Sequence, residues 1–161
     1  MDAADRRARI TAEIQEKTGI SEEMIDTLVR KFYANVRNDA VLGPIFESRI
    51  EDWESHFVRL AAFWSSVALM TGRYHGRPMD AHMPLPIDAA HFDTWLAIFE
   101  KTAHEVCPPD AALHFIERAR RIAESLELGI AMRHGKLLGR NERFRLPDSD
   151  GPTPKELTHA E

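Results

Sequence analysis

His82 is the residue whose type and position point most directly to chemistry in this sequence. It lies in a short segment with Pro78 before it and Pro84 and Pro86 after it, between two long amphipathic stretches. Since prolines at 84 and 86 cannot continue a helix, any helix that carries His82 must end almost at once. A histidine on such a short turn can direct one ring nitrogen into an enclosed space, and neutral imidazole is the commonest protein ligand for a metal. The alternative is that His82 only covers a helix end.

Three other residues with polar tips could meet His82 in the interior. Tyr33, His56 and Trp95 each fall on or beside the apolar face of a separate predicted helix. A buried tyrosine hydroxyl or indole N–H needs a hydrogen-bond partner. Three such groups converging on one centre suggest a small polar ligand inside an apolar cavity. The alternative for each of them is an ordinary position in the core.

The elements that must position these residues are predicted to be helices almost throughout. Apolar residues recur at helical spacing within about 5–18, 21–37, 52–71, 88–106 and 109–134, and no convincing alternating strand is present. Between the second and third of these helices, the run from Asn38-Asp39 through Leu42-Gly43-Pro44 is expected to break the helix. Ile45 and Phe46 are expected to follow as core residues in a turn. The sequence therefore predicts an all-α protein of five or six helices.

Composition and charge exclude several classes of protein. The 161 residues are 29% charged and 43% hydrophobic, which is typical of one soluble globular domain. A net charge of -5 gives no general attraction to nucleic acid or to an anionic membrane, so neither is expected as a partner. The single cysteine, Cys107, is compatible with a reducing cytoplasm, and no apolar run approaches the roughly 20 residues that span a bilayer. We expect a cytoplasmic protein.

The usual catalytic motifs are absent from the sequence. It contains no glycine-rich phosphate loop, no nucleophile elbow and no paired cysteines. None of the eight histidines has another three or four residues away, which argues against a compact two-histidine metal site on one helix.

An ordered set of short motifs resembles the truncated haemoglobins, and most resembles group III of that family. The resemblance spans roughly residues 20–133, and the sequence has no Gly-Gly pair, which also fits group III. The motifs, in chain order, are Phe32-Tyr33, Leu42-Gly43-Pro44-Ile45-Phe46, Trp53-x-x-His56, Phe63-Trp64, Tyr74-x-Gly76-x-Pro78-Met79-x-x-His82 and Phe92-x-x-Trp95.

This resemblance implies a truncated globin fold, a two-on-two helical sandwich around a haem. The cofactor would be haem b held non-covalently, because the Cys-x-x-Cys-His attachment signature is absent. Arg59, Arg73 and Arg77 are candidates to pair with the haem propionates, since guanidinium matches a carboxylate in bidentate geometry. The remaining expected roles are His82 as the iron ligand, Tyr33 and Trp95 as hydrogen-bond donors to the bound ligand, His56 as the distal histidine, and Phe46 and Tyr74 as contacts of the porphyrin.

The resemblance also divides the chain. Residues 1–19 are predicted as a helical N-terminal extension, 20–135 as the truncated globin domain, and 136–161 as a mobile C-terminal tail rich in charges and proline.

The function implied is binding of dioxygen and other diatomic ligands at a five-coordinate iron, as in oxygen transport. Redox turnover of oxygen, nitric oxide or peroxide, as in a nitric oxide dioxygenase or a peroxidase-like enzyme with a reductase partner, is left open. Two alternatives from other classes remain: a helical protein-interaction module without a cofactor, and a non-haem metal hydrolase that uses several of the histidines.

Overall fold

The computed structural model describes residues 2–78, 82 and 85–146, and across these residues it contains helices and no strand. This confirms the all-α prediction, and no described helix has the length and apolarity needed to cross a membrane. The helices are α1 (Ala3–Thr18), α2 (Glu22–Arg37), α3 (Leu42–Arg49), α4 (Trp53–Leu69), α6 (Ala89–Val106) and α7 (Pro109–Arg133).

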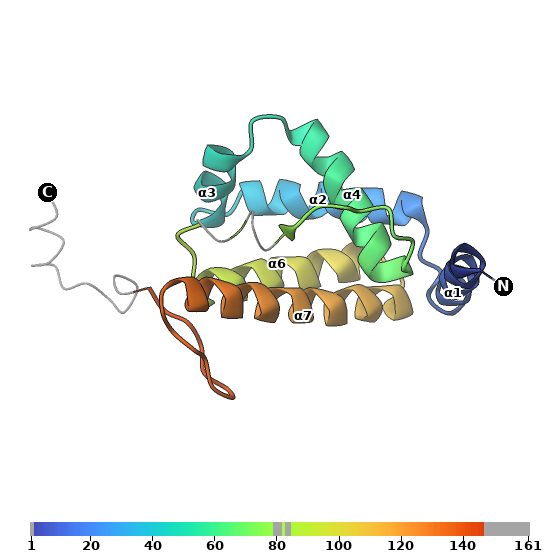
Figure 1. Ribbon diagram of the computed structural model, residues 1–161. Coiled ribbons are helices and arrows are strands. Elements are labelled where there is room, and N and C mark those ends of the chain that lie inside the picture. The colour runs from blue at the N-terminus through green and yellow to red at the C-terminus, as the bar shows by residue number, and fades with distance from the viewer. Residues whose placement is uncertain (1, 79–81, 83–84, 147–161) are drawn as a thin grey trace, which may run out of the picture.

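Four of these helices form two layers (Figure 1). Helices α2 and α4 make one layer, α6 and α7 make the other, and α2 packs against both α4 and α6. This is the two-on-two arrangement that the sequence predicts. Large aromatic side chains fill the space between the layers, with Phe32, Phe99 and Phe115 each no more than 1% exposed.

Several helix ends follow from local side-chain chemistry. Gly19 ends α1 in the left-handed conformation, with φ of 74°, and Ser21 caps α2 by accepting from the backbone N–H of Met24 at 3.1 Å. Asp88 caps α6 and is part of a capping box with His91. Helix α4 ends at Leu69, with Met70 in the left-handed conformation, slightly before the stop expected at Gly72.

The helix break predicted from Asn38 is confirmed, because α2 ends at Arg37, but the break is shorter than predicted. Leu42 to Phe46 belong to the short helix α3, so the prediction that Ile45 and Phe46 lie in a turn is wrong. Proline is tolerated in the first turn of a helix, where its missing N–H has no partner to lose. The Asp39 carboxylate accepts from the backbone N–H of Leu42 at 2.9 Å and so satisfies the start of the helix. Helix α3 carries Phe46 toward the core.

The N-terminal helix is attached to the end of the bundle. Helix α1 lies across that end, beside α4 and α7 (Figure 1). The Thr11 hydroxyl donates to the carbonyl oxygen of Leu69 at 2.6 Å. None of the α1 side chains is fully buried, so α1 contributes little to the core.

The tail predicted to be mobile from residue 136 is ordered in its first part, which corrects that expectation. Residues 136–146 leave the end of α7 and return to the start of α6, where Phe144 is only 1% exposed. In the sequence this segment is short and charged. Phe144 is its one aromatic residue, and the residues around it show no helical periodicity that would indicate a buried position. Residues 147–161 lie outside the described part of the chain.

Candidate functional site

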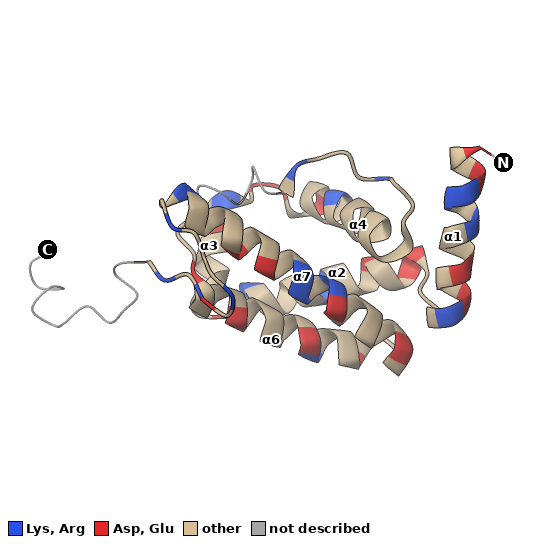
Figure 2. Cartoon of the chain, turned by 60° about the horizontal axis from the view of Figure 1, so that its bottom comes forward, with Lys and Arg blue, Asp and Glu red and all other residues tan. Residues whose placement is uncertain are grey.

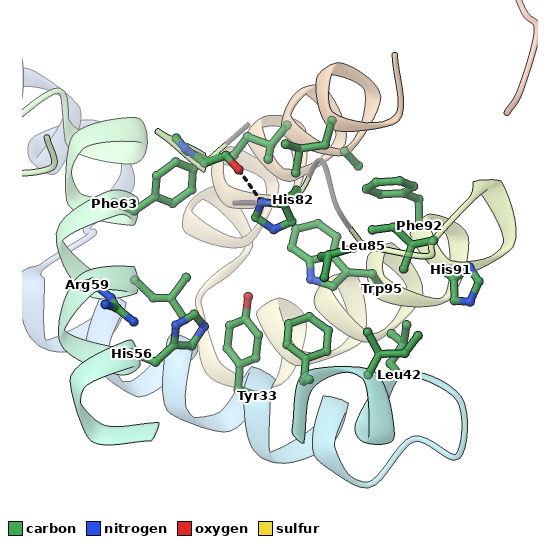
Figure 3. Close-up of a pocket in the computed structure, with 18 of the residues that line it drawn as sticks. Tyr33, Leu42, His56, Arg59, Phe63, His82, Leu85, His91, Phe92 and Trp95 are labelled. Carbon is green, nitrogen blue, oxygen red and sulfur yellow. Dashed lines mark hydrogen bonds between the residues drawn. The ribbon is translucent and has the colours of Figure 1, made fainter. Parts of the chain in front are cut away.

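A cavity of about 210 Å³ lies between the two layers, with His82 on one side of it and Tyr33 on the other (Figure 3). A second hollow of about 600 Å³ adjoins it, shares His56, Arg59 and His82 with it, and continues to exposed residues such as Glu51. The two together form one pocket with a wide mouth. The described residues that line the inner cavity are Tyr33, Leu42, Ile45, Phe46, His56, Arg59, Leu60, Phe63, Trp64, Tyr74, Pro78, His82, Leu85, Ile87, His91, Phe92, Trp95, Ile122, Ala123 and Leu126.

His82 presents one ring nitrogen to this cavity. Its Nδ1 atom lies 2.6 Å from the carbonyl oxygen of Pro78, and both residues have helical backbone conformation. A carbonyl oxygen can only accept, so Nδ1 carries the hydrogen and Nε2 keeps its lone pair. Pro84, one of the prolines used to predict the short turn, lies outside the described residues.

Tyr33 faces His82 from the opposite wall (Figure 3). It is 5% exposed, and burial raises the pKa of its hydroxyl well above the usual value, so the hydroxyl keeps its hydrogen at any physiological pH. The nearby Trp95 indole acts against this rise in the pKa. The Tyr33 hydroxyl points into the cavity toward His82, where it is available to a bound group.

His56 completes the wall around Tyr33. Its ring meets the Tyr33 ring edge-on, with centroids 5.7 Å apart, and the Trp53 ring edge-on at 5.9 Å. Burial is the largest cause that lowers the pKa of His56 to about 4, and the electrostatic effects of Arg59 and His82 act in the same direction. His56 is therefore a neutral imidazole near pH 7.

The aromatic residues predicted to contact a cofactor do line the cavity. Phe46 packs edge-on against Tyr33, with ring centroids 5.5 Å apart, and is half-buried. Tyr74 packs edge-on against Phe63 at 5.3 Å, on the His82 side of the pocket. Both side chains can offer an apolar surface to a flat ring.

The three arginines predicted to pair with the haem carboxylates have different surroundings in the structure. Arg59 lines both parts of the pocket, at its mouth. Arg73 instead forms an ion pair with Glu22 at 3.3 Å, and neither Arg73 nor Arg77 is among the described residues that line the pocket.

Sequence reasoning did not assign several residues of the pocket to it. Leu85 and Ile87 follow His82, and Ile122, Ala123 and Leu126 come from the stripe of α7, which helical spacing identified only as core. Trp53 is not among the described residues that line the pocket, but its ring contacts that of His56. Its Nε1 atom, beside His56, is the one buried side-chain nitrogen or oxygen in the described part of the chain without a hydrogen-bond partner.

The three histidines among the described lining residues, His56, His82 and His91, do not form a cluster that could hold a metal ion. No group of three or more histidine, cysteine or acidic side chains that could hold a metal ion occurs within residues 2–78, 82 and 85–146. A metal bound at His82 therefore needs its other ligands from a non-protein group. An apolar pocket with one imidazole on one wall and a hydroxyl donor on the other fits an iron porphyrin in its chemistry.

Three comparisons with known proteins agree with this geometry. Residues 13–125 match the model of the family described as bacterial-like globin. Over 113 residues the chain is 34% identical to "Group 3 truncated hemoglobin ctb" of Campylobacter jejuni, which covers 67% of this chain and 89% of that protein. Its fold is similar to the crystal structure of group III truncated hemoglobin from Campylobacter jejuni, with a TM-score of 0.63 over 66% of this chain and 88% of that chain. The family match begins inside α1, somewhat before the boundary expected at residue 20.

Proposed function

This chain belongs to the bacterial-like globin family as a truncated haemoglobin most like group III, and we propose that it binds haem b non-covalently between His82 and Tyr33. Globins bind small diatomic ligands through haem. For this chain we propose dioxygen and similar diatomic molecules as the ligands. The observation that carries the proposal is the opposed placement of the His82 ring and the Tyr33 hydroxyl across one apolar pocket.

His82 would hold the iron through Nε2. The hydrogen bond from Nδ1 to Pro78 orients the ring and increases the basicity of Nε2, as partners of metal-bound histidines commonly do. When bound, haem would supply an iron that can take up a diatomic ligand. Tyr33, His56 and Trp95 line the same pocket and would surround that ligand.

Tyr33 would be the hydrogen-bond donor to the ligand. A hydroxyl donor stabilises negative charge on a small ligand more in an apolar cavity than in water. The Trp95 indole lies close enough to the Tyr33 hydroxyl to influence its pKa, so Trp95 would act on the ligand through Tyr33. Neutral His56 lies beside them, where the inner cavity meets its mouth.

Arg59 would pair with the carboxylates at the edge of the cofactor. It is exposed, and it lines the pocket where the inner cavity meets the surface. Arg73 already neutralises Glu22, so we propose Arg59 in its place.

Redox turnover of oxygen, nitric oxide or peroxide would extend this function. A donor that stabilises charge on bound oxygen also polarises an O–O bond, and electrons would then come from a reductase. Ligand binding is the part that the pocket supports most directly.

Absorption spectra of the ferric, ferrous and carbon-monoxide forms test the proposal. We expect the purified protein, or the protein titrated with haemin, to show an intense Soret band at a stoichiometry of one haem per chain. A colourless protein whose thermal unfolding is unchanged by haemin would contradict the proposal and favour an interaction module. Stoichiometric zinc without haem would favour a metal hydrolase.

A further inference from the structure

The ordered segment after α7 reaches the wall of the pocket. We call residues 136–146 the C-terminal arm. The family match ends at residue 125, so the arm lies beyond it. The arm leaves α7, forms a turn and returns to the first residues of α6, as Figures 1 and 2 show.

Backbone groups join the arm to the start of α6. The Ala89 N–H donates to the carbonyl oxygen of Phe144 at 2.8 Å, and the Leu146 N–H donates to Asp88 Oδ2 at 3.0 Å. Asp88 is fully buried and also caps α6. The first N–H groups of a helix have no partner inside the helix, so the arm supplies an acceptor that α6 needs.

Arg143 links α6 to α7, the two helices of one layer, through hydrogen bonds to both. Its guanidinium group donates to Glu127 of α7 at 2.8 and 2.9 Å, to Asp93 of α6 at 2.8 Å, and to the carbonyl oxygen of Ala89 at 3.3 Å. Glu127 is 5% exposed and also accepts from the backbone N–H of Phe144 at 2.9 Å. Without Arg143 this buried carboxylate would lose its counter-charge, which is strongly destabilising.

Phe144 belongs to the same apolar cluster as the wall of the pocket. It is 1% exposed and lies in a cluster of buried residues with Ile87, Phe92, Ala123 and Leu126, all four of which line the cavity. Ile87 stands in the short connection between His82 and α6.

From these contacts we propose that the C-terminal arm positions the His82 wall of the pocket, with Arg143 and Phe144 as positioning residues. The arm holds Asp88 and Ala89, and therefore the end of the connection that follows His82. It also holds α6, which presents Phe92 and Trp95 to the pocket. The inference rests on the proposed function in one respect, which is that His82 holds the iron of a haem.

Four variants of the full chain test this inference. Arg143→Ala removes the guanidinium group, Arg143→Lys keeps a cation beside Glu127, and Phe144→Ala removes the buried ring. Arg140→Ala, on an exposed residue of the same arm, removes an equal charge. Ile116→Ala serves as a second control. Ile116 is 3% exposed and lies outside the pocket lining, so its substitution should lower the stability of the fold at a place away from the arm.

Two readouts report on the pocket of the haem-loaded protein. We expect Arg143→Ala and Phe144→Ala to speed haem transfer to a scavenger protein at least tenfold and to shift or broaden the iron–histidine stretching band of the ferrous form. Arg143→Lys should fall in between, and both controls should keep the wild-type band. If the two arm variants lose haem no faster than Ile116→Ala and keep the wild-type band, the inference is wrong.

Hydrogen exchange of the haem-free chain separates the two proposals. If the wild-type protein retains no haem, the proposed function fails, and amide exchange still tests the arm. We then expect Arg143→Ala to speed exchange at Phe92 and Trp95 at least tenfold relative to Arg140→Ala. Equal exchange in the two variants would overturn the positioning role.

Discussion

The Nδ1 atom of His82 lies 2.6 Å from the carbonyl oxygen of Pro78, four residues earlier in the chain. This one contact determines which nitrogen of the ring faces the pocket, since Nδ1 must carry the hydrogen. It also gives Pro78 a role beyond restricting the backbone, because its carbonyl oxygen orients the side chain of His82.

Replacing Tyr33 should weaken retention of oxygen. A hydrogen bond that involves a charged group contributes about 1.5–3 kcal/mol, so Tyr33→Phe should raise the oxygen dissociation rate at least several-fold. Stopped-flow displacement of oxygen by carbon monoxide measures this rate. Tyr74→Phe is the matched control, because Tyr74 lines the same pocket without facing the open side, and its rate should stay within about twofold of wild type. An unchanged rate in Tyr33→Phe would remove Tyr33 as the donor.

Trp95 should affect the ligand less than Tyr33 does. Its indole lies close enough to the Tyr33 hydroxyl to influence the pKa of that group, so Trp95→Phe loosens the surroundings of the donor but does not remove it. We expect an oxygen dissociation rate between those of the wild type and Tyr33→Phe, and little further change when both substitutions are combined. Additive effects in the double variant would show that Trp95 contacts the ligand independently.

His56 should make stability depend on pH in the acid range. Its pKa is lowered to about 4 in the folded protein, against about 6.5 in an unfolded chain. Between these pH values the unfolded chain binds more protons, so the stabilisation is complete above pH 6.5 and is lost as pH falls toward 4. Urea unfolding of the haem-free protein should show His56→Gln losing part of this pH dependence. If the free energies of unfolding of His56→Gln and wild type differ by a constant amount between pH 7.5 and 4, this prediction is wrong.

Gly43 should be required for the placement of α3. A Cβ atom at this position would lie 2.5 Å from the carbonyl oxygen of Arg37, a backbone atom that cannot move aside easily. We expect Gly43→Ala to cost about 1–3 kcal/mol in the free energy of unfolding. Gly139→Ala is the control, because its Cβ would meet only the end of the flexible Glu142 side chain. Similar urea midpoints for the two variants would show that α3 can move to accommodate the Cβ atom without loss of stability.

Helical periodicity predicted most of the fold because α2, α4, α6 and α7 each bury one face. The helices α2 and α6 lie within the predicted ranges 21–37 and 88–106. The prediction failed at Leu42-Gly43-Pro44, where breaking residues form a helix start. It failed again at Phe144, since a single buried ring in a charged segment has no periodicity to reveal it.

The ordered motifs along the chain also predicted that several residues with polar tips would share one pocket. Tyr33, His56, His82 and Trp95 do line one cavity. The arginines could not be ranked in advance, because the partner of an exposed side chain depends on tertiary placement. The Arg73–Glu22 pair joins residues far apart in the sequence, and no local pattern indicates it.

Chemical rescue of His82→Gly tests the central claim most directly. The substitution removes the imidazole ring while leaving space that free imidazole can occupy. We expect the ferrous spectrum of His82→Gly to lose the iron–histidine stretching band, and added imidazole to restore such a band together with carbon-monoxide binding. A His82→Gly protein that keeps the wild-type band without imidazole would show that another residue holds the iron.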